Sequence, residues 1–178
     1  SWTSVGPMNV SRTFASAVLM PSGKVLVAGG TVSSAVTEIF DPSTVTWTTT
    51  GNLNTNRLGQ SMALIPSQNK ILIVGGHGDD SVEFYNIISG AWTQVNGALS
   101  DARQYGALVT LADGRLISIG GISAATATVM ASVDLYTPAN DSWTQVVATL
   151  ATARYFFQAV RLSTGTSGNV IVMGGTDG

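Results

Sequence analysis

The sequence contains no cysteine and a single histidine, His77, among its 178 residues. Without cysteine the chain forms neither disulfides nor thiolate metal sites, and the cysteine count leaves its compartment open. One histidine in a predicted loop, with no G-x-S-x-G elbow in the sequence, gives no support for nucleophilic catalysis. We therefore expect no catalytic residue, metal site or cofactor in residues 1–178.

Charged residues are also scarce, at 10% of the chain, and the net charge is −2. Because there is no basic surface to collect phosphates, nucleic acid is not an expected partner. No apolar run approaches the roughly 18 residues of a membrane span. Few lysines, many threonines and two N-x-S/T sequons, at Asn9 and Asn140, favour an extracellular, glycosylated protein, while a cytoplasmic location stays open.

What the sequence does contain is one motif repeated along its whole length. The tryptophans at positions 2, 47, 92 and 143 lie 45, 45 and 51 residues apart. Length varies mainly after the glycine pairs and before the last pair, so those segments are predicted loops. The repeated positions are Arg12, Arg57, Arg103 and Arg154; Gly29 and Gly30, Gly75 and Gly76, Gly120 and Gly121, Gly174 and Gly175; Glu38, Glu83 and Asp134; and Trp2, Trp47, Trp92 and Trp143.

The sequence pattern of each repeat unit predicts four short antiparallel strands. The first follows the arginine, the second is an apolar run such as ILIVGG, the third carries an acid-x-aromatic pattern, and the fourth begins at tryptophan. Turn sequences such as PSGK and DPSTVT separate them. Second strands that are apolar at nearly every position are expected to be buried on both faces, and their glycines to allow positive φ. The chain is therefore predicted to be all-β.

This combination of arginine, double glycine, acid-x-aromatic strand and tryptophan resembles the kelch repeats of a β-propeller, over essentially all 178 residues. The resemblance implies blades of four antiparallel strands around a central channel, with the arginine strand innermost and the tryptophan strand outermost. Residues 3–49, 50–95 and 96–147 would form three complete blades, and 148–178 an incomplete fourth, of one propeller region (1–178). Loops joining fourth to first strands and second to third strands would share one face, commonly used for binding.

The recurring charged and aromatic residues are interpreted as structural. A residue present in every unit is most economically explained by something that every blade needs, namely paired and hydrogen-bonded buried charge. The tryptophans are expected to cover the edges between blades. The expected ion pairs are Arg12 with Glu38, Arg57 with Glu83, and Arg103 with Asp134.

The stretch ILIVGGHGDD, residues 71–80, carries the histidine and two adjacent carboxylates. It is not a dinucleotide fingerprint, since the third glycine and a following helix are missing. A metal site is disfavoured because one histidine and two neighbouring carboxylates offer too few ligands. We interpret it as one of several partner-binding loops (31–37, 77–81 and 122–131; 50–56, 96–102 and 148–153), with His77, Asp79, Asp80, Asn54, Asn56, Asp101, Thr126 and Met130 as candidate contacts.

Two functions fit these features. The first is a non-catalytic kelch propeller module that binds a protein or glycan through its loop face, or serves as a structural unit of an extracellular assembly. The alternative is the propeller portion of a galactose-oxidase-like copper radical oxidase, which residues 99–121 resemble in cadence. That resemblance implies two histidines, two tyrosines and a cysteine, so the active-site residues of such an enzyme would lie outside this chain.

The two ends of the chain do not form a complete blade. The sequence opens with a predicted tryptophan strand, WTSV, and closes with the first two strands of a fourth unit. An unclosed arc would expose an apolar face and bare strand edges, which folded proteins avoid. In addition, no acidic residue follows Arg154 at the spacing seen after its counterparts. We expect the remainder of a propeller, or another chain, to complete the structure.

Overall fold

The computed structural model describes residues 3–76, 80–95, 98–162 and 169–178. This part of the chain is all-β apart from one 3-10 turn, η1 (Pro66–Gln68). Its strands are β1 (Ser16–Leu19), β2 (Val25–Ala28), β3 (Glu38–Asp41), β4 (Thr46–Thr49), β5 (Ser61–Ile65), β6 (Lys70–Val74), β7 (Val82–Asn86), β8 (Trp92–Gln94), β9 (Ala107–Thr110), β10 (Leu116–Ile119), β11 (Val133–Thr137), β12 (Ser142–Val146), β13 (Tyr155–Arg161) and β14 (Val170–Thr176).

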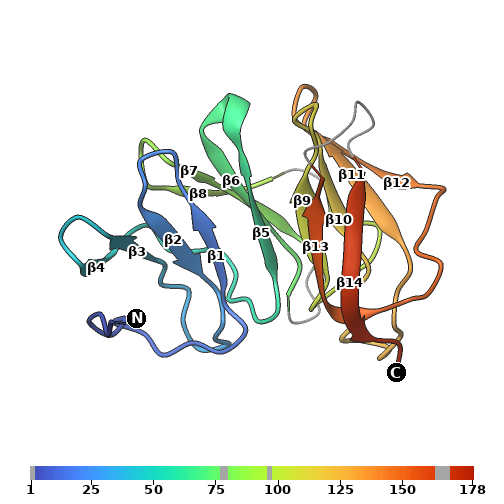
Figure 1. Ribbon diagram of the computed structural model, residues 1–178, viewed down its shortest axis with the longest axis horizontal. Helices are drawn as coiled ribbons and strands as arrows, with labels where there is room; N and C mark the ends of the chain where they lie inside the picture. The colour runs from blue at the N-terminus through green and yellow to red at the C-terminus, as the bar shows by residue number, and fades with distance from the viewer. Residues whose placement is uncertain (1–2, 77–79, 96–97, 163–168) are drawn as a thin grey trace.

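The strands form four antiparallel sheets in which sequence neighbours are also spatial neighbours (Figure 1). The first sheet has the order β1-β2-β3-β4, the second β5-β6-β7-β8 and the third β9-β10-β11-β12, while the fourth contains β13 and β14. The predicted turn signals act as expected: in PSGK, the N–H of Gly23, at φ 83°, donates to the carbonyl of Met20 at 2.9 Å. The sequence thus folds as consecutive meanders.

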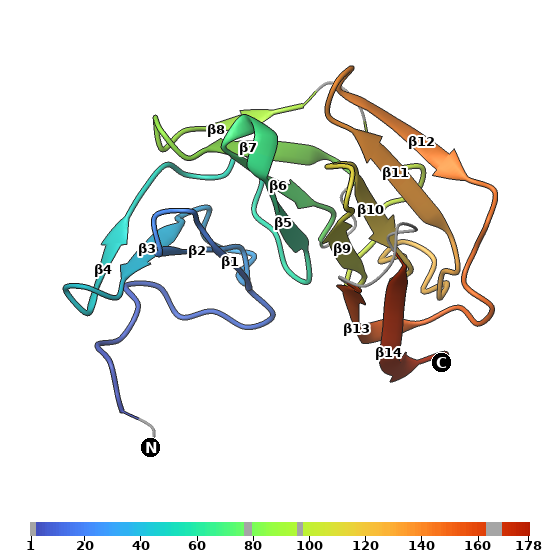
Figure 2. The same cartoon turned by 45° about the horizontal axis from the view of Figure 1, so that its top comes forward.

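The four sheets stand side by side along an arc, with β1, β5, β9 and β13 at its centre and β4, β8 and β12 at its periphery (Figure 2). An apolar core fills the space between each pair of neighbouring sheets. Leu26 and Ile71 belong to the core between the first two sheets, Leu72 and Leu116 to the core between the second and third, and Val109 and Phe157 to the core between the third and fourth.

The second strand of each sheet makes this stacking possible because both of its faces are apolar. In β6, Ile73 belongs to the core shared with the first sheet and Leu72 to the core shared with the third, and both are fully buried. In β14 the two faces differ. Val172 packs against the third sheet, whereas Ile171, which corresponds to Leu72, is 40% exposed. The outer face of the fourth sheet is therefore apolar but uncovered in the described chain.

The third and fourth strands are joined by one aromatic pair per sheet. The register places the aromatic residue of the acid-x-aromatic pattern directly opposite the tryptophan, where side chains on one face interact. The ring centroids are 5.0 Å apart for Phe40 and Trp47, 5.2 Å for Tyr85 and Trp92, and 5.1 Å for Tyr136 and Trp143.

Two details differ from the sequence-based expectation. The N-terminal strand WTSV is not formed by residues 3–8, and Trp2 lies outside the described residues. β4, β8 and β12 each pair with a third strand, whereas residues 3–8 pair with no described strand. In addition, β1 begins at Ser16 rather than next to Arg12, because Phe14 takes a left-handed φ of 54° that interrupts an extended strand.

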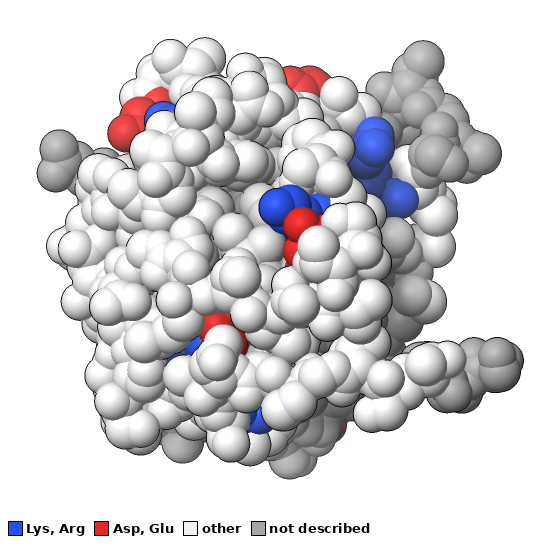
Figure 3. All heavy atoms as spheres, turned by 90° about the vertical axis from the view of Figure 1, so that its left-hand side faces the viewer, with Lys and Arg blue, Asp and Glu red and all other residues white. Residues whose placement is uncertain are grey.

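The surface is poor in charge, as the composition requires. Figure 3 views the molecule from the side of the first sheet and shows only scattered Lys, Arg, Asp and Glu side chains on an otherwise neutral face. Within the described residues, no helix has the length and apolar character needed to cross a membrane.

Candidate functional site

Each complete sheet buries one arginine against one carboxylate. In the second sheet Arg57 Nη2 lies 3.0 Å from Glu83 Oε1, and both side chains are fully buried. Arg57 Nη1 donates to the carbonyl oxygens of Gly75 at 2.8 Å and Ser81 at 3.0 Å. The guanidinium thus ties the end of the second strand to the start of the third. The equivalent pairs, Arg12–Glu38 at 2.9 Å and Arg103–Asp134 at 2.5 Å, confirm the predicted pairing in all three sheets.

Glu83 also fixes the loop that precedes Arg57. The backbone N–H groups of Asn54 and Thr55 donate to its carboxylate at 2.7 and 3.3 Å, and the Asn54 side-chain Nδ2 donates at 2.8 Å. Because charge-assisted bonds of this kind are about twice as strong as neutral ones, the buried carboxylate organises the path of this loop. Asn54, a predicted partner contact, therefore has a structural role.

Glu38 repeats this arrangement in the first sheet. The N–H groups of Asn9 and Val10 donate to it at 2.6 and 3.2 Å, and Asn9 Nδ2 donates at 2.9 Å. Burial by itself would raise the pKa of Glu38, but hydrogen bonds from Arg12 and Asn9 outweigh burial and hold its pKa below the ordinary value. The amide of the first predicted sequon thus faces a buried carboxylate, whereas Asn140 is exposed in the β11–β12 turn.

The third cluster is less complete. Asp134 is one methylene shorter than glutamate, and Ser100 replaces the asparagine, donating from Oγ to Asp134 Oδ2 at 3.0 Å. Asp134 Oδ1 and Arg103 Nε are buried and have no hydrogen-bond partner among the described residues. Burial lowers the pKa of the Arg103 guanidinium, against the opposing influence of the Asp134 charge.

Backbone hydrogen bonds from the glycine pairs join neighbouring sheets. The N–H of Gly76 donates to the carbonyl oxygen of Arg103 at 2.8 Å, from the second sheet to the third. Gly30 and Gly121 donate in the same way to the carbonyls of Arg57 and Arg154. All eight glycines of the four pairs have positive φ, as predicted: Gly29, Gly30, Gly75, Gly76, Gly120, Gly121, Gly174 and Gly175.

Two of the three described tryptophans lie between neighbouring sheets, as expected. Trp92 is buried between the first two sheets, and its Nε1 donates to Thr37 Oγ1 at 3.2 Å. Trp143 packs against the core between the second and third sheets. Trp47 is half-buried, and its Nε1 donates to the carbonyl of Gly6 at 3.0 Å. The indole rings of Trp92 and Trp143 are therefore part of the packing between sheets.

The predicted loops do share one face. Backbone hydrogen bonds join each fourth-to-first loop to the neighbouring second-to-third loop, which places both at the same end of the sheets. These bonds are Leu53 N–H to Ala35 O at 2.9 Å, Leu99 N–H to Asp80 O at 3.0 Å, and Leu150 N–H to Ala131 O at 2.9 Å. We call this end the loop face.

The candidate contacts on the loop face have different environments. Asp101, Thr126 and Met130 border one hollow of about 390 Å³, but Met130 is buried and does not offer its side chain to a partner. Asn56 Nδ2 donates to the carbonyl of Val32 at 3.0 Å. Asp80 is exposed. His77 and Asp79 lie outside the described residues.

An aromatic cluster outside the predicted binding loops lies where the inner strands begin. Phe14, Tyr105 and Phe156 each stand two residues after a repeat arginine, and all three have left-handed φ, between 54° and 57°. Their ring centroids are 5.1 Å apart for Phe14 and Tyr105, 4.2 Å for Tyr105 and Phe156, and 5.7 Å for Phe14 and Phe156. Phe14 is 57% and Phe156 50% exposed, so the rings form an accessible aromatic triplet.

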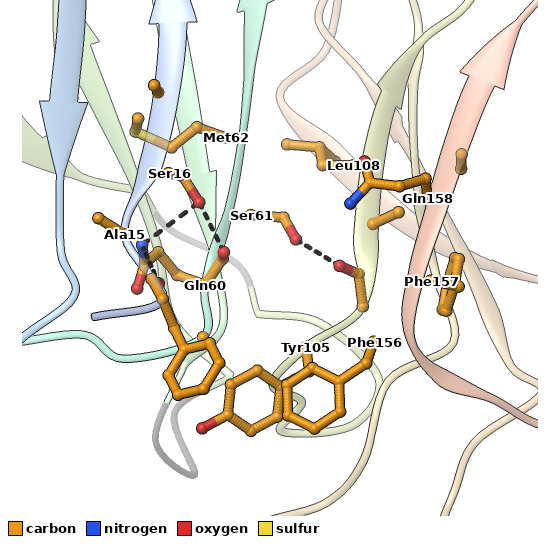
Figure 4. Close-up of a pocket in the computed structure, with 16 residues that line it drawn as sticks. Ala15, Ser16, Gln60, Ser61, Met62, Tyr105, Leu108, Phe156, Phe157 and Gln158 are labelled. Atoms are coloured by element: carbon orange, nitrogen blue, oxygen red, sulfur yellow. Dashed lines mark hydrogen bonds between the residues drawn. The ribbon is translucent and has the colours of Figure 1, made fainter. Parts of the chain in front are cut away.

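The aromatic triplet lies at one end of a cleft of about 360 Å³ between the inner strands (Figure 4). Ser16, Gln60, Ser61 and Gln158 also line this cleft, and no lining residue carries a charge. The Gln60 amide is buried, and its Nε2 donates to the Ala28 carbonyl at 3.1 Å, whereas Gln158 is exposed. Ser16 Oγ donates to the Gln60 carbonyl at 2.7 Å, which links β1 to the start of β5. The cleft therefore combines apolar ring faces with neutral hydrogen-bonding groups.

The sequence contained a signal for this cluster. The segments RTF, RLG, RQY and RYF place an aromatic residue at the same repeat position in three of four units, with Gly59 in the other. What the sequence could not show is that rings from the first, third and fourth sheets meet. Gly59 makes room for this, because a Cβ there would stand 2.5 Å from Tyr105 Cε1.

No grouping of three or more metal-ligating side chains occurs among the described residues. A scan against models of protein families and a search of curated proteins both find no match to this chain.

Proposed function

We propose that the chain is part of a kelch-type β-propeller that binds a neutral glycan, without catalysis, in the cleft beside the aromatic triplet. The carrying observation is backbone strain: a left-handed conformation costs an ordinary residue about 1–2 kcal/mol, and Phe14, Tyr105 and Phe156 all adopt it. Gly59 occupies the same position in the second sheet, at φ 73°, without that cost. The local backbone would favour glycine at these positions, so we attribute the presence of aromatic rings there to contact with a ligand.

The chemistry of the cleft favours a sugar over a charged ligand. A pyranose presents one face of C–H groups and a rim of hydroxyls, which match an aromatic face and nearby amide and hydroxyl groups respectively. Gln158 provides an exposed amide along the same cleft, and the hydroxyls of Ser16 and Ser61, which donate to the carbonyls of Gln60 and Gly106, present oxygen acceptors there. A phosphate or an acidic peptide would find no cation there, because no lining residue is charged.

The arrangement of charge supports a non-catalytic role. Three of the four repeat arginines are engaged by a buried carboxylate and backbone carbonyls, so they stabilise the sheets and do not face the cleft. Charged groups with shifted pKa values occur in structural ion-pair networks as well as in active sites, so these buried pairs do not by themselves indicate catalysis. An extracellular location belongs to the same proposal and rests on the lysine-poor composition and the sequons.

The uncovered apolar face of the fourth sheet supports the propeller assignment. Val160, Ile171 and Met173 are 47%, 40% and 50% exposed. Their repeat equivalents in the second sheet, Ala63, Leu72 and Val74, are 9%, 0% and 2% exposed because the third sheet covers them. Further blades packing on this face would remove the exposed patch, as in the other sheets.

Binding to neutral oligosaccharides tests the proposal. Calorimetric titration of the 178-residue chain with a panel of neutral oligosaccharides should find at least one that binds. The variant Tyr105→Gly removes one ring, while glycine suits the local φ of 57°. It should weaken that binding by about tenfold or more, since truncating an aromatic side chain at the centre of a binding surface typically costs about 2 kcal/mol.

The matched control is Ile88→Ala, which truncates an 84%-exposed side chain in the turn between β7 and β8. This variant should bind as the wild type does. Absence of binding to every neutral sugar, or equal binding by wild type and Tyr105→Gly with both folded, would refute the glycan proposal. Binding of a protein partner that Tyr105→Gly abolishes would instead assign the cleft to protein recognition.

A further inference from the structure

Among the described residues, Arg154 has no carboxylate partner of the kind that its counterparts have. Its Nη1 donates to the carbonyl of Gly174 at 2.8 Å, just as Arg57 Nη1 donates to Gly75. Arg12, Arg57 and Arg103 each pair with a buried acid on the third strand of their sheet, but no carboxylate of the described residues pairs with Arg154. The guanidinium is therefore held in position on one side and is open on the other.

The edge of β14 next to Arg154 is also open. β2, β6 and β10 each pair on both sides, with a first and a third strand, whereas β14 pairs only with β13 among the described residues. An unpaired edge offers a row of N–H and C=O groups on which an extended segment can add as a strand. Arg154 and the β14 edge thus provide a charged pocket and a backbone template side by side.

The three complete sheets show which residues of a third strand face each position of the second strand. In β7, the acid Glu83 lies opposite Ile73, two residues before the glycine pair, and the aromatic Tyr85 lies opposite Ile71. Glu38 lies opposite Val27 and Asp134 opposite Ser118, which are equivalent positions. In β14 the equivalent of Ile73 is Val172, and the equivalent of Ile71 is Val170.

In the second sheet the carboxylate also accepts hydrogen bonds from backbone N–H groups, and the equivalent N–H groups precede Arg154. Asn54 and Thr55, three and two residues before Arg57, donate their N–H groups to Glu83. The residues at the same distances before Arg154 are Ala151 and Thr152.

We propose that the β14 edge and Arg154 form a docking site for an extended segment that carries an acid-x-aromatic pattern. The segment adds antiparallel to β14, with its acid opposite Val172 and its carboxylate on Arg154. This inference rests on the repeat geometry and is independent of glycan binding in the cleft.

A peptide from the chain itself serves as the probe. The segment 80–95, DSVEFYNIISGAWTQV, contains the acid-x-aromatic strand and the tryptophan strand that follows it. Fluorescence anisotropy of the labelled peptide should show saturable binding to the 178-residue chain. A peptide carrying Glu83→Gln should bind about tenfold more weakly or worse, and a scrambled peptide should not bind, because both a charge-assisted bond and the register are lost.

Variants of the chain locate the site. Arg154→Gln should weaken peptide binding by a similar factor, whereas Arg161→Gln, an exposed arginine at the far end of β13, should leave it unchanged. Arg154→Glu should restore binding to a peptide carrying Glu83→Lys, which a merely unfolded variant cannot do. The proposal is overturned if the peptide does not bind, if glutamate and glutamine peptides bind equally, or if Arg154→Gln binds like the wild type.

Discussion

The backbone N–H of Gly76 donates to the carbonyl oxygen of Arg103 at 2.8 Å, across the boundary between the second and third sheets. The guanidinium of Arg103 meanwhile holds the carbonyl of Gly120 at 3.1 Å, and Gly121 bonds onward to the carbonyl of Arg154. One arginine thus fastens its own sheet through its side chain and the preceding sheet through its backbone. This double role explains why arginine and a glycine pair recur together in every unit.

Gly75→Ala should destabilise the protein more than a comparable glycine substitution elsewhere. A Cβ at Gly75, which has φ 65°, would collide with the Arg103 carbonyl oxygen. Gly114 has φ 87°, but a Cβ added there would meet no atom within 4 Å, so Gly114→Ala is the control for the conformational cost alone. We expect chemical denaturation to show Gly75→Ala less stable than Gly114→Ala by about 1–3 kcal/mol. Equal losses would mean that this contact between sheets adapts freely.

Glu83→Gln should cost about 3 kcal/mol of unfolding free energy, because it leaves the buried Arg57 guanidinium without its counter-charge. The control is Arg115→Gln, which breaks the pair with Asp113, where the two side chains are 44% and 50% exposed. Exposed pairs contribute about 0–1 kcal/mol. Urea denaturation of both variants measures the difference, and similar losses would contradict the structural role assigned to the repeat arginines.

The double substitution Ser100→Asn with Asp134→Glu should stabilise the third sheet. It introduces the residues found at these positions in the first two sheets, where the carboxylate receives both a side-chain amide and backbone N–H groups. Asp134 Oδ1 is buried and has no partner among the described residues, so satisfying it should add about 1 kcal/mol. Each single substitution should gain less than the double one, and a loss of stability in the double variant would show that the third cluster is built differently.

The ion pairs were predictable from sequence because they depend on spacing within one unit. Arg57 and Glu83 recur with their neighbours in each repeat, and a buried arginine requires an acid nearby. The aromatic triplet was not predictable, although its residues share a repeat position. Its formation depends on how far the arc curves and on the left-handed φ of Phe14, which brings rings from non-adjacent sheets together. Neither property is encoded in the spacing of motifs.

The same limit applied to individual loop residues. The shared loop face followed from the repeat, but the burial of Met130 depends on the bridge between Ile122 and Val129, which folds the long loop back on itself. Likewise WTSV, residues 2–5, matches the tryptophan strands of the other units, yet residues 3–5 form no strand, because a strand needs a neighbour as well as a suitable sequence.

Phe14→Gly should be more stable than Phe14→Ala, by about 1 kcal/mol, because both remove the ring but only glycine tolerates a left-handed φ without strain. The φ of Phe14 is 54°. Thermal unfolding of the two variants gives the comparison directly. The reverse order would show that Phe14 is not strained in solution, and the argument from strain to function would lose its basis.

Chemical-shift mapping during titration with a neutral oligosaccharide tests whether the cleft binds glycan. Perturbed backbone and aromatic resonances should concentrate in the residues that line the cleft, 14–17, 59–62, 105–108 and 156–159. The resonances of the buried Arg57–Glu83 cluster should stay unchanged. Perturbations confined to the loop 122–131, or no perturbation with any neutral sugar, would contradict the account.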